Sequence, residues 1–292
     1  MASNIPIIVI VGPTASGKTS LSIQLAQEYG GEIICADSRT VYKGMDIGTA
    51  KPSAQEQADV PHWGLDLALP TDRYTAADFK HYADNKIAEI KSRGRLPIIV
   101  GGTGLYVDAV IFDYQFPQPM SSKDRAYFEN LPRNELINYC LKNNIELPTD
   151  DKNTRRLLRA INDPGSSYQR KIIPKSDTLI VGIATNKAAL RKRIEERTEH
   201  MFENGVVEEA TLLGKKYGWN AEAMTSNVYR VIQMYLSGEE TIEKTKEIFT
   251  TRDIQLAKRQ MTWFRRNPYI EWCQQSEVES YITSTLASEC NL

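Results

Sequence analysis

Residues 12–19 constrain this chain most, because GPTASGKT matches the phosphate-binding loop pattern Gly-x-x-x-x-Gly-Lys-Thr, the P-loop. A run of β-branched residues, 7–11, precedes the loop and has the length and composition of a buried strand. Residues 20–29 follow with the spacing of a short amphipathic helix. A strand, a glycine loop and a helix in this order distinguish a phosphate-binding loop from a chance match. The sequence therefore predicts a site for a diphosphate or a triphosphate.

Each conserved position of this pattern has a chemical role in holding phosphate. Gly12 and Gly17 let the backbone curl so that its N–H groups point inward, toward an anion. Lys18 reaches the outer phosphate, and the hydroxyl group of Thr19 can hold Mg²⁺. The alternative is a glycine turn without a ligand, which the complete pattern in its strand and helix context disfavours. The loop alone does not say whether the ligand is ATP.

Composition limits the other classes of protein. The chain has 292 residues with 41% hydrophobic content, enough for one large domain or for one domain with an insertion. Its formal net charge of −1 requires any nucleic-acid surface to come from local clustering of basic residues. Four scattered cysteines without a C-x-x-C pair argue against a zinc site and a disulfide framework. With neither a signal peptide nor an apolar run of membrane length, we expect a cytoplasmic protein without membrane contact.

A second strand is predicted at residues 32–37, and it ends in Asp37. Ligand sites of α/β proteins gather at the carboxyl ends of such strands. A polar loop over residues 37–52 follows, and long ordered loops of this kind are usually functional. We interpret Asp37 as a base or a Mg²⁺ ligand, with a helix cap or a loop bracket as the alternative. His62 and Trp63 are expected in a further loop, without a catalytic role.

A second glycine-rich turn follows another predicted buried strand, at residues 96–100. The turn reads Gly-Gly-Thr-Gly over residues 101–104 and leads into a helix. Beside a P-loop, this turn is a candidate wall of the same site. Capping of the helix by Thr103 is the alternative, and both roles can hold together.

The sequence changes character between residues 112 and 174, where prolines separate short helical segments and buried-strand runs are few. We predict a helical insertion domain at residues 116–175, within a core formed by residues 1–115 and 176–292. Residues 153–162 (NTRRLLRAIN) place Arg155, Arg156 and Arg159 around one helix. Such charges usually face solvent, but contact with a phosphate backbone is a reasonable alternative.

The core is predicted to resume with a strand at residues 178–185. A long or broken helix over 187–216 carries Arg193 and Arg197 four residues apart, on one face. Further predicted elements are a helix at 75–93, a helix at 251–266, a last strand at 269–272 and a small surface helix from 276.

Several motifs then occur in one order over about residues 7–272: GPTASGKT, DSRTVYKGMDIGTAKP, PHW, YTAADF, GGTGLY, RIEER and LAKRQMTWFRR. In this the chain resembles the tRNA dimethylallyltransferase (tRNA isopentenyltransferase) family of bacteria. The resemblance implies an α/β fold, a P-loop NTPase-like core with a parallel sheet flanked by helices, and a helical insertion that binds the tRNA anticodon stem-loop. It implies transfer of a dimethylallyl group from dimethylallyl diphosphate to the 6-amino group of the adenosine 3′-adjacent to the anticodon. The implied product is N6-isopentenyladenosine, and the implied cofactor is Mg²⁺. We expect a monomer, although the sequence itself leaves the oligomeric state open.

The resemblance also assigns roles to residues. It implies Asp37 as the general base, with Thr103 and Arg197 as the other catalytic residues. The implied diphosphate-binding residues are Gly12, Pro13, Thr14, Ala15, Ser16, Gly17, Lys18 and Thr19, with Thr19 also the metal ligand. The implied tRNA-binding residues are Asp37, Ser38, Arg39, Thr40, Thr103, Arg125, Arg155, Arg156, Leu157, Leu158 and Arg159.

The chain departs from the family pattern at two places. Thr40 stands where the family usually has Gln, and Val228-Tyr229-Arg230 lacks the family's glycine at its first position. The zinc-finger extension of eukaryotic members is absent from these residues.

Three other functions remain as alternatives. A transferase that uses free AMP or ADP would need neither the insertion nor the basic segments. A P-loop kinase or NTPase would need further apparatus for a γ-phosphate, which the sequence does not show. A nucleic-acid-binding protein with a nonfunctional loop is disfavoured by the intact Lys18 and Thr19. The set of modified tRNAs and the order of substrate binding stay open.

Overall fold

The computed structural model describes residues 5–118, 120–163 and 170–289, and the chain divides into two compact units. Unit 1 comprises Met1–Ile111 and Pro174–Leu292, and unit 2 comprises Phe112–Ile173. The sequence placed the corresponding boundaries at residues 116 and 175. Each unit is described by itself.

A six-stranded parallel sheet forms the centre of unit 1, with the strand order β3-β2-β4-β1-β5-β6. The strands are β1 (Ile7–Val11), β2 (Gly31–Cys35), β3 (His62–Trp63), β4 (Leu96–Gly101), β5 (Thr178–Ala184) and β6 (Glu271–Gln274). β1, β2 and β4 are buried along their whole length, which explains the continuous apolar run of β1 and the mainly apolar sequence of β4, while β2 also buries Glu32. The predicted α/β class with a parallel sheet is confirmed.

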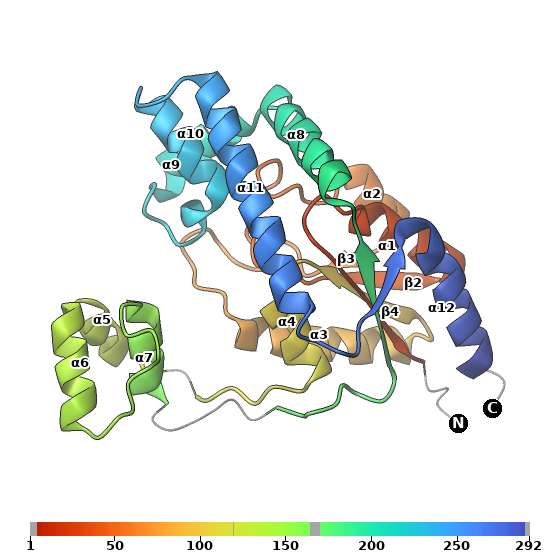
Figure 1. Ribbon diagram of the computed structural model, residues 1–292, viewed down its shortest axis with the longest axis horizontal. Helices are drawn as coiled ribbons and strands as arrows, with labels where there is room; N and C mark the ends of the chain where they lie inside the picture. Colours follow the sequence, from red (N-terminus) through yellow and green to blue (C-terminus); the bar gives the residue numbers. More distant parts are fainter. Residues whose placement is uncertain (1–4, 119, 164–169, 290–292) are drawn as a thin grey trace. The chain divides into compact units, whose positions relative to one another are not determined.

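Helices cover both faces of this sheet. The helices of unit 1 are α1 (Lys18–Tyr29), α2 (Ala54–Asp59), α3 (Ala76–Ser92), α4 (Gly104–Ile111), α8 (Lys187–Glu203), α9 (Val206–Tyr217), α10 (Asn227–Leu236), α11 (Ile242–Phe264) and α12 (Gln275–Glu289). Figure 1 shows α1 and α12 on one side of the sheet and α3 and α4 on the other. Helices α8 to α11 pack on one another and form a further helical layer of unit 1.

Several predicted elements differ from those observed. His62 and Trp63 were expected in a loop, but they pair with Ile33 and Ile34 as the edge strand β3. The indole N–H of Trp63 also donates to the buried Glu32 at 2.7 Å, so the pairing has side-chain support that hydrophobic periodicity does not reveal. The last strand lies two residues beyond its predicted position, at Glu271–Gln274.

The C-terminal part of the chain is more deeply packed than predicted. The expected surface helix is α12, and its Val278 and Ile282 are fully buried in the core beneath α1. Of the long or broken helix predicted over 187–216, the broken form is observed: it is interrupted at Gly205, whose left-handed backbone (φ 92°) precedes α9. Helix α11 starts earlier than predicted because Thr241 caps it, accepting a hydrogen bond from the Lys244 backbone N–H at 3.2 Å.

Unit 2 is helical and has a small core of its own. Its helices are α5 (Ser122–Glu129), α6 (Arg133–Lys142) and α7 (Thr154–Asn162). Leu136, Cys140 and Leu157 are completely buried at its centre. No helix within the described ranges of the chain is long and apolar enough to cross a membrane.

Candidate functional site

Three neighbouring strands bring the predicted site loops to one edge of the sheet. β2, β4 and β1 are adjacent and parallel, so the loops that follow them emerge side by side. The approach is very close between the ends of β2 and β4: a Cβ atom at Gly101 would lie 2.0 Å from the carbonyl oxygen of Ala36. The backbone N–H of Thr103 donates to that same oxygen at 3.3 Å. Gly101 is therefore required by the contact between the two loops.

The P-loop has the curled backbone that its sequence predicts. Ala15 and Gly17 have positive φ angles of 59° and 89°, and Gly17 begins helix α1. The Lys18 ammonium folds back over the loop and donates to the carbonyl oxygen of Pro13 at 2.6 Å. Burial lowers the pKa of Lys18 to about 8; the carboxylate of Asp37 opposes this shift and the positive charge of Arg197 adds to it. The ammonium is thus desolvated and ready to exchange a carbonyl for a phosphate oxygen.

Two side chains from distant helices brace the P-loop at Thr14. The backbone N–H of Thr14 donates to Gln260 Oε1 at 2.8 Å, and Arg197 donates to the Thr14 hydroxyl group. Gln260 also packs against the second glycine turn, since a Cβ atom at Gly102 would lie 2.3 Å from its Nε2. Next to it, Trp263 occupies the space that a Cβ at Gly104 would need, at 2.2 Å. Helix α11 therefore clamps both glycine loops.

The loops of Asp37 and Thr103 are connected by hydrogen bonds between Thr103 and Ser38, the residue that follows Asp37. Asp37 Oδ1 accepts the Arg39 backbone N–H at 2.7 Å, so the loop-bracket role considered from the sequence is present. Thr103 Oγ1 accepts the Ser38 backbone N–H at 3.0 Å and donates to Ser38 Oγ at 3.3 Å. The Thr103 hydroxyl therefore ties the second glycine turn to the loop that carries Asp37.

A cavity of about 500 Å³ collects these groups. Its lining contains all the predicted P-loop residues except Gly12 and Pro13, and it includes Asp37, Ser38, Arg39, Thr40, Thr103 and Arg197. Thr19 lies next to Lys18 on this lining, and Thr19 is exposed, so its hydroxyl group is accessible to a metal ion. A hydroxyl oxygen is the kind of ligand atom that Mg²⁺ prefers. Mg²⁺ itself stays a prediction.

Several residues of this cavity were not predicted from the sequence. Asp253 is 5% exposed, and burial raises its pKa, against the opposing effects of Arg197 and of a hydrogen bond with Asn227. Asp253 and Gln260 lie on the same face of α11, together with Phe249 and Leu256, which also line the cavity. The spacing 249, 253, 256, 260 was a usable signal, because two polar residues interrupt a stripe of helical period.

The two departures from the family pattern also lie at this cavity. Thr40 is buried on its lining, and within the described residues its hydroxyl has no hydrogen-bond partner. Val228 lines the cavity from α10, while the adjacent Tyr229 is fully buried and Arg230 is exposed.

Unit 2 holds the remaining predicted residues. Arg155, Arg156 and Arg159 are exposed on α7, whereas the side chain of Leu157 is completely buried. Contact of these residues with tRNA stays a prediction. Leu158 packs against the same core, so both leucines hold the helix. Acidic residues lie near two of the predicted arginines. Arg156 lies 3.9 Å from Asp150, and Arg125 pairs with Glu129 at 3.1 Å.

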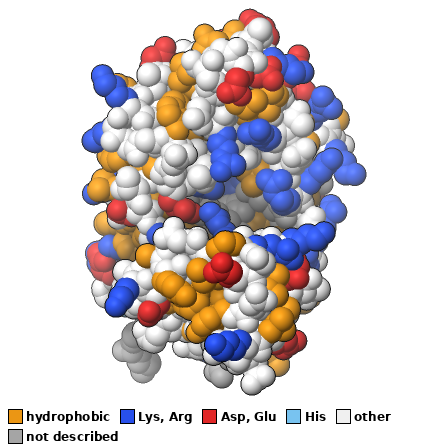
Figure 2. Space-filling model, turned by 90° about the vertical axis from the view of Figure 1, so that its left-hand side faces the viewer, with side chains coloured by type: hydrophobic (Ala, Val, Ile, Leu, Met, Phe, Trp, Pro, Cys, Tyr) orange, Lys and Arg blue, Asp and Glu red, His pale blue; other side chains and the backbone are white. Residues whose placement is uncertain are grey.

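Lys and Arg side chains are numerous on the surface although the chain has a formal net charge of −1. Figure 2 shows them on the face that it displays, together with Asp and Glu side chains.

Comparison with known proteins gives a consistent group of relatives. The family model described as IPP transferase matches residues 40–267. A tRNA dimethylallyltransferase of Macrococcus caseolyticus is 36% identical, over 98% of this chain and 96% of the relative. The crystal structure of a tRNA isopentenylpyrophosphate transferase from Bacillus halodurans is similar with a TM-score of 0.75 and 32% identity, covering 98% of each chain. A eukaryotic dimethylallyltransferase acting on tRNA is similar with a TM-score of 0.73 and 26% identity, covering 96% of this chain and 77% of that one.

The depressed pKa of Lys18 predicts how anion binding depends on pH. Below a pH of about 8 the side chain is an ammonium that attracts a diphosphate, and above it the side chain is neutral. The affinity for inorganic pyrophosphate should therefore weaken as the pH rises through about 8, and titration calorimetry at several pH values measures this. Lys18→Met is the matched control, because the ionisation of pyrophosphate itself affects both proteins equally. Parallel curves for the two proteins would show that Lys18 does not titrate in this range.

Proposed function

Because the chain belongs to the IPP transferase family, we propose that it transfers a dimethylallyl group from dimethylallyl diphosphate to a tRNA adenosine. The acceptor atom in this proposal is the 6-amino nitrogen of the adenosine 3′-adjacent to the anticodon, and the product is N6-isopentenyladenosine. The observation that supports it most is one cavity that holds a braced P-loop, a carboxylate at Asp37 and the Thr103 hydroxyl together.

The P-loop side of the cavity suits a diphosphate leaving group. When the allylic C–O bond breaks, the diphosphate departs with the electron pair and gains negative charge. The loop N–H groups, the Lys18 ammonium and the Arg197 guanidinium line the place where that charge develops. Since Gln260 and Arg197 fix Thr14 from outside the loop, these donors are held in position before the reaction.

The reaction also requires a proton acceptor for the attacking amine. The adenine amine is a weak nucleophile because its lone pair is delocalised into the ring, and it must lose a proton as the C–N bond forms. Asp37 is the proposed general base, since its carboxylate lines the cavity at the end of β2. Its Oδ1 is engaged by the Arg39 backbone N–H, which fixes the orientation of the carboxylate.

We propose Mg²⁺ as the cofactor, with the Thr19 hydroxyl as its protein ligand beside the phosphates. When bound, the ion supplies further neutralisation of the diphosphate charge. The tRNA-contacting role of unit 2 is likewise a proposal, and it is supported by the exposed Arg155, Arg156 and Arg159 on α7.

The acceptor specificity separates this function from its rivals. Labelled dimethylallyl diphosphate should be consumed with a tRNA that has adenosine 3′ of its anticodon, but not with AMP and not without an acceptor. Chromatography of the nucleosides, after digestion of the tRNA, should place the label on N6-isopentenyladenosine. Label on AMP would identify the free-nucleotide transferase, and label on no acceptor would reject both transferases.

Asp37→Asn tests the assignment of the base. The amide keeps the size of the side chain but cannot accept the proton, so single-turnover transfer should slow by about 100-fold or more. The affinity for pyrophosphate should change little, because Lys18 and the loop N–H groups remain, and the affinity for tRNA should change far less than the rate. Asp59→Asn, on the exposed face of α2, is the control with the same loss of charge. A rate for Asp37→Asn near that of the control would remove Asp37 from the base role.

A further inference from the structure

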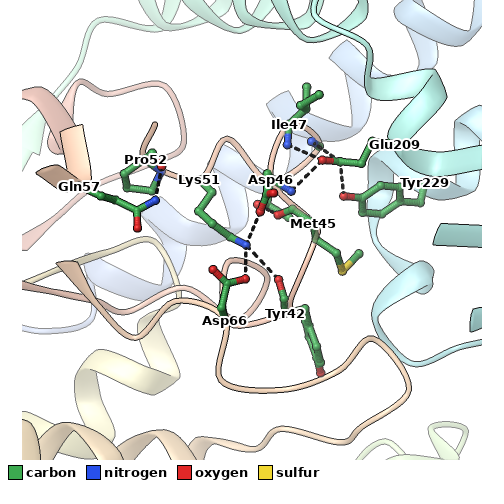
Figure 3. Close-up of polar contacts among 12 residues, drawn as sticks. Tyr42, Met45, Asp46, Ile47, Lys51, Pro52, Gln57, Asp66, Glu209 and Tyr229 are labelled. Carbon is green, nitrogen blue, oxygen red and sulfur yellow. Dashed lines mark hydrogen bonds and ion pairs between the residues drawn. The ribbon is translucent and has the colours of Figure 1, made fainter. Parts of the chain in front are cut away.

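The loop that follows Asp37 is held by a carboxylate from a distant helix. Glu209, in α9, accepts the backbone N–H groups of Asp46 at 2.8 Å, Ile47 at 2.7 Å and Gly48 at 2.9 Å. Figure 3 shows the Glu209 side chain reaching these amides, and the Tyr229 hydroxyl donating to the same carboxylate, at 2.7 Å. Three consecutive amides and a phenol thus converge on one anion, a backbone nest filled by a side chain of the protein itself.

A second ion cluster holds the same loop from its other side. The Lys51 ammonium contacts Asp46 at 2.5 Å, Asp66 at 2.7 Å and the Tyr42 carbonyl oxygen at 3.1 Å (Figure 3). The Lys51 side chain is only 3% exposed. Because Lys51 bonds residues of the loop and its neighbour Asp66, it keeps the loop folded on itself. The contacts from Glu209 and Tyr229 instead tie the loop to α9 and α10.

The tied segment forms one wall of the central cavity. The cavity lining includes Gly48, Thr49, Ala50 and Pro52. This part of the loop is neither helix nor strand, so no regular hydrogen-bonding pattern of its own holds it in place. A Cβ atom at Gly48 would lie 2.8 Å from the Tyr229 hydroxyl oxygen. The tyrosine side chain therefore packs directly against the backbone of Gly48 and limits how far this wall can move toward α10. The position of the wall therefore depends on Glu209 and Tyr229, although neither residue lines the cavity.

The P-loop does not depend on these contacts. Its brace comes from Gln260 and Arg197, on α11 and α8, and acts at Thr14. Loss of the Glu209 carboxylate should thus leave the diphosphate half of the cavity intact. It should displace the wall at residues 48–52, since three backbone donors would lose their charged acceptor together.

We infer that Glu209 is a positioning residue of the transfer reaction: it sets the cavity wall at residues 48–52 and so the alignment of the two substrates. This inference rests on the proposed prenyl transfer. Glu209 contacts neither the reacting atoms nor the diphosphate, and it acts through the loop amides and Tyr229. Misplacement of a wall slows a reaction between two aligned substrates more than it weakens the binding of either one.

Glu209→Gln is the variant that tests the role of the carboxylate. The amide keeps the shape but replaces one acceptor oxygen by a donor, which faces other donors. Transfer at saturating substrates should fall by about tenfold or more, because hydrogen bonds to a charged acceptor are the strong ones. The affinity for inorganic pyrophosphate should stay within about twofold of wild type. Glu208→Gln is the matched control, since Glu208 is the exposed neighbour in the same first turn of α9, and its rate should be unchanged.

Two further measurements keep the test decisive. Amide hydrogen exchange should accelerate at residues 46–48 in Glu209→Gln but not in Glu208→Gln, and this readout does not need the proposed activity. Tyr229→Phe removes one donor and keeps the carboxylate, so transfer should slow less, by about twofold to fivefold, with pyrophosphate affinity retained.

The outcomes separate the inference from the proposed function. A wild-type protein that transfers no prenyl group overturns the function, while the exchange at residues 46–48 still tests the contact. An unchanged transfer rate in Glu209→Gln, or a loss of pyrophosphate affinity that parallels the loss of rate, overturns the positioning role. If Glu209→Gln does not fold, an unchanged rate in Tyr229→Phe overturns it instead.

Discussion

The close approach of two strand ends is the constraint on which the site depends. The carbonyl oxygen of Ala36, beyond β2, lies where a side chain at Gly101 of β4 would begin, 2.0 Å from an ideal Cβ. In this close contact the loop of Asp37 packs against the turn of Thr103, and the hydrogen bonds between Thr103 and Ser38 hold the two loops together. β1 lies next to β4, so the P-loop joins the same edge. The parallel sheet brings the three loops to one edge, and the absence of a side chain at Gly101 lets two of them pack closely enough to line one cavity.

The helical layer of unit 1 completes what the sheet edge begins. Helix α11 places Gln260 against the P-loop and Trp263 against Gly104, while its Asp253 is buried in the cavity beside Arg197. Helix α9 reaches the far wall through Glu209. The sheet therefore carries the groups proposed to do chemistry, and the helices determine where those groups point. A substitution in the helical layer can alter the reaction without touching a substrate.

The sequence was informative where a role is local. The P-loop conformation follows from its own glycines, and the placement of Asp37 and Thr103 follows from strands that end beside it. Gln260 contacts Thr14 across 246 positions of the chain, and Glu209 reaches Gly48 across 161. The helical spacing in α11 indicates that Gln260 shares a face with Asp253, but no local pattern identifies the partner of Gln260 or of Glu209. The burial of Leu157 was not predicted for a related reason: a basic helix has a buried side, and only the packed unit shows which of its residues lie on that side. The short strand β3 escaped because two residues carry no period.

We propose that the P-loop of this chain holds the diphosphate of an isoprenoid, where the same pattern in other proteins holds a nucleotide. The most direct measurement is prenyl transfer to an anticodon stem-loop in the presence of Mg²⁺ and with no ATP, followed by mass spectrometry of the modified adenosine. We expect full transfer by the wild-type protein under these conditions and none by Lys18→Ala, which lacks the ammonium beside the departing diphosphate. A strict requirement for ATP, or rapid ATP hydrolysis without any modified adenosine, would contradict it.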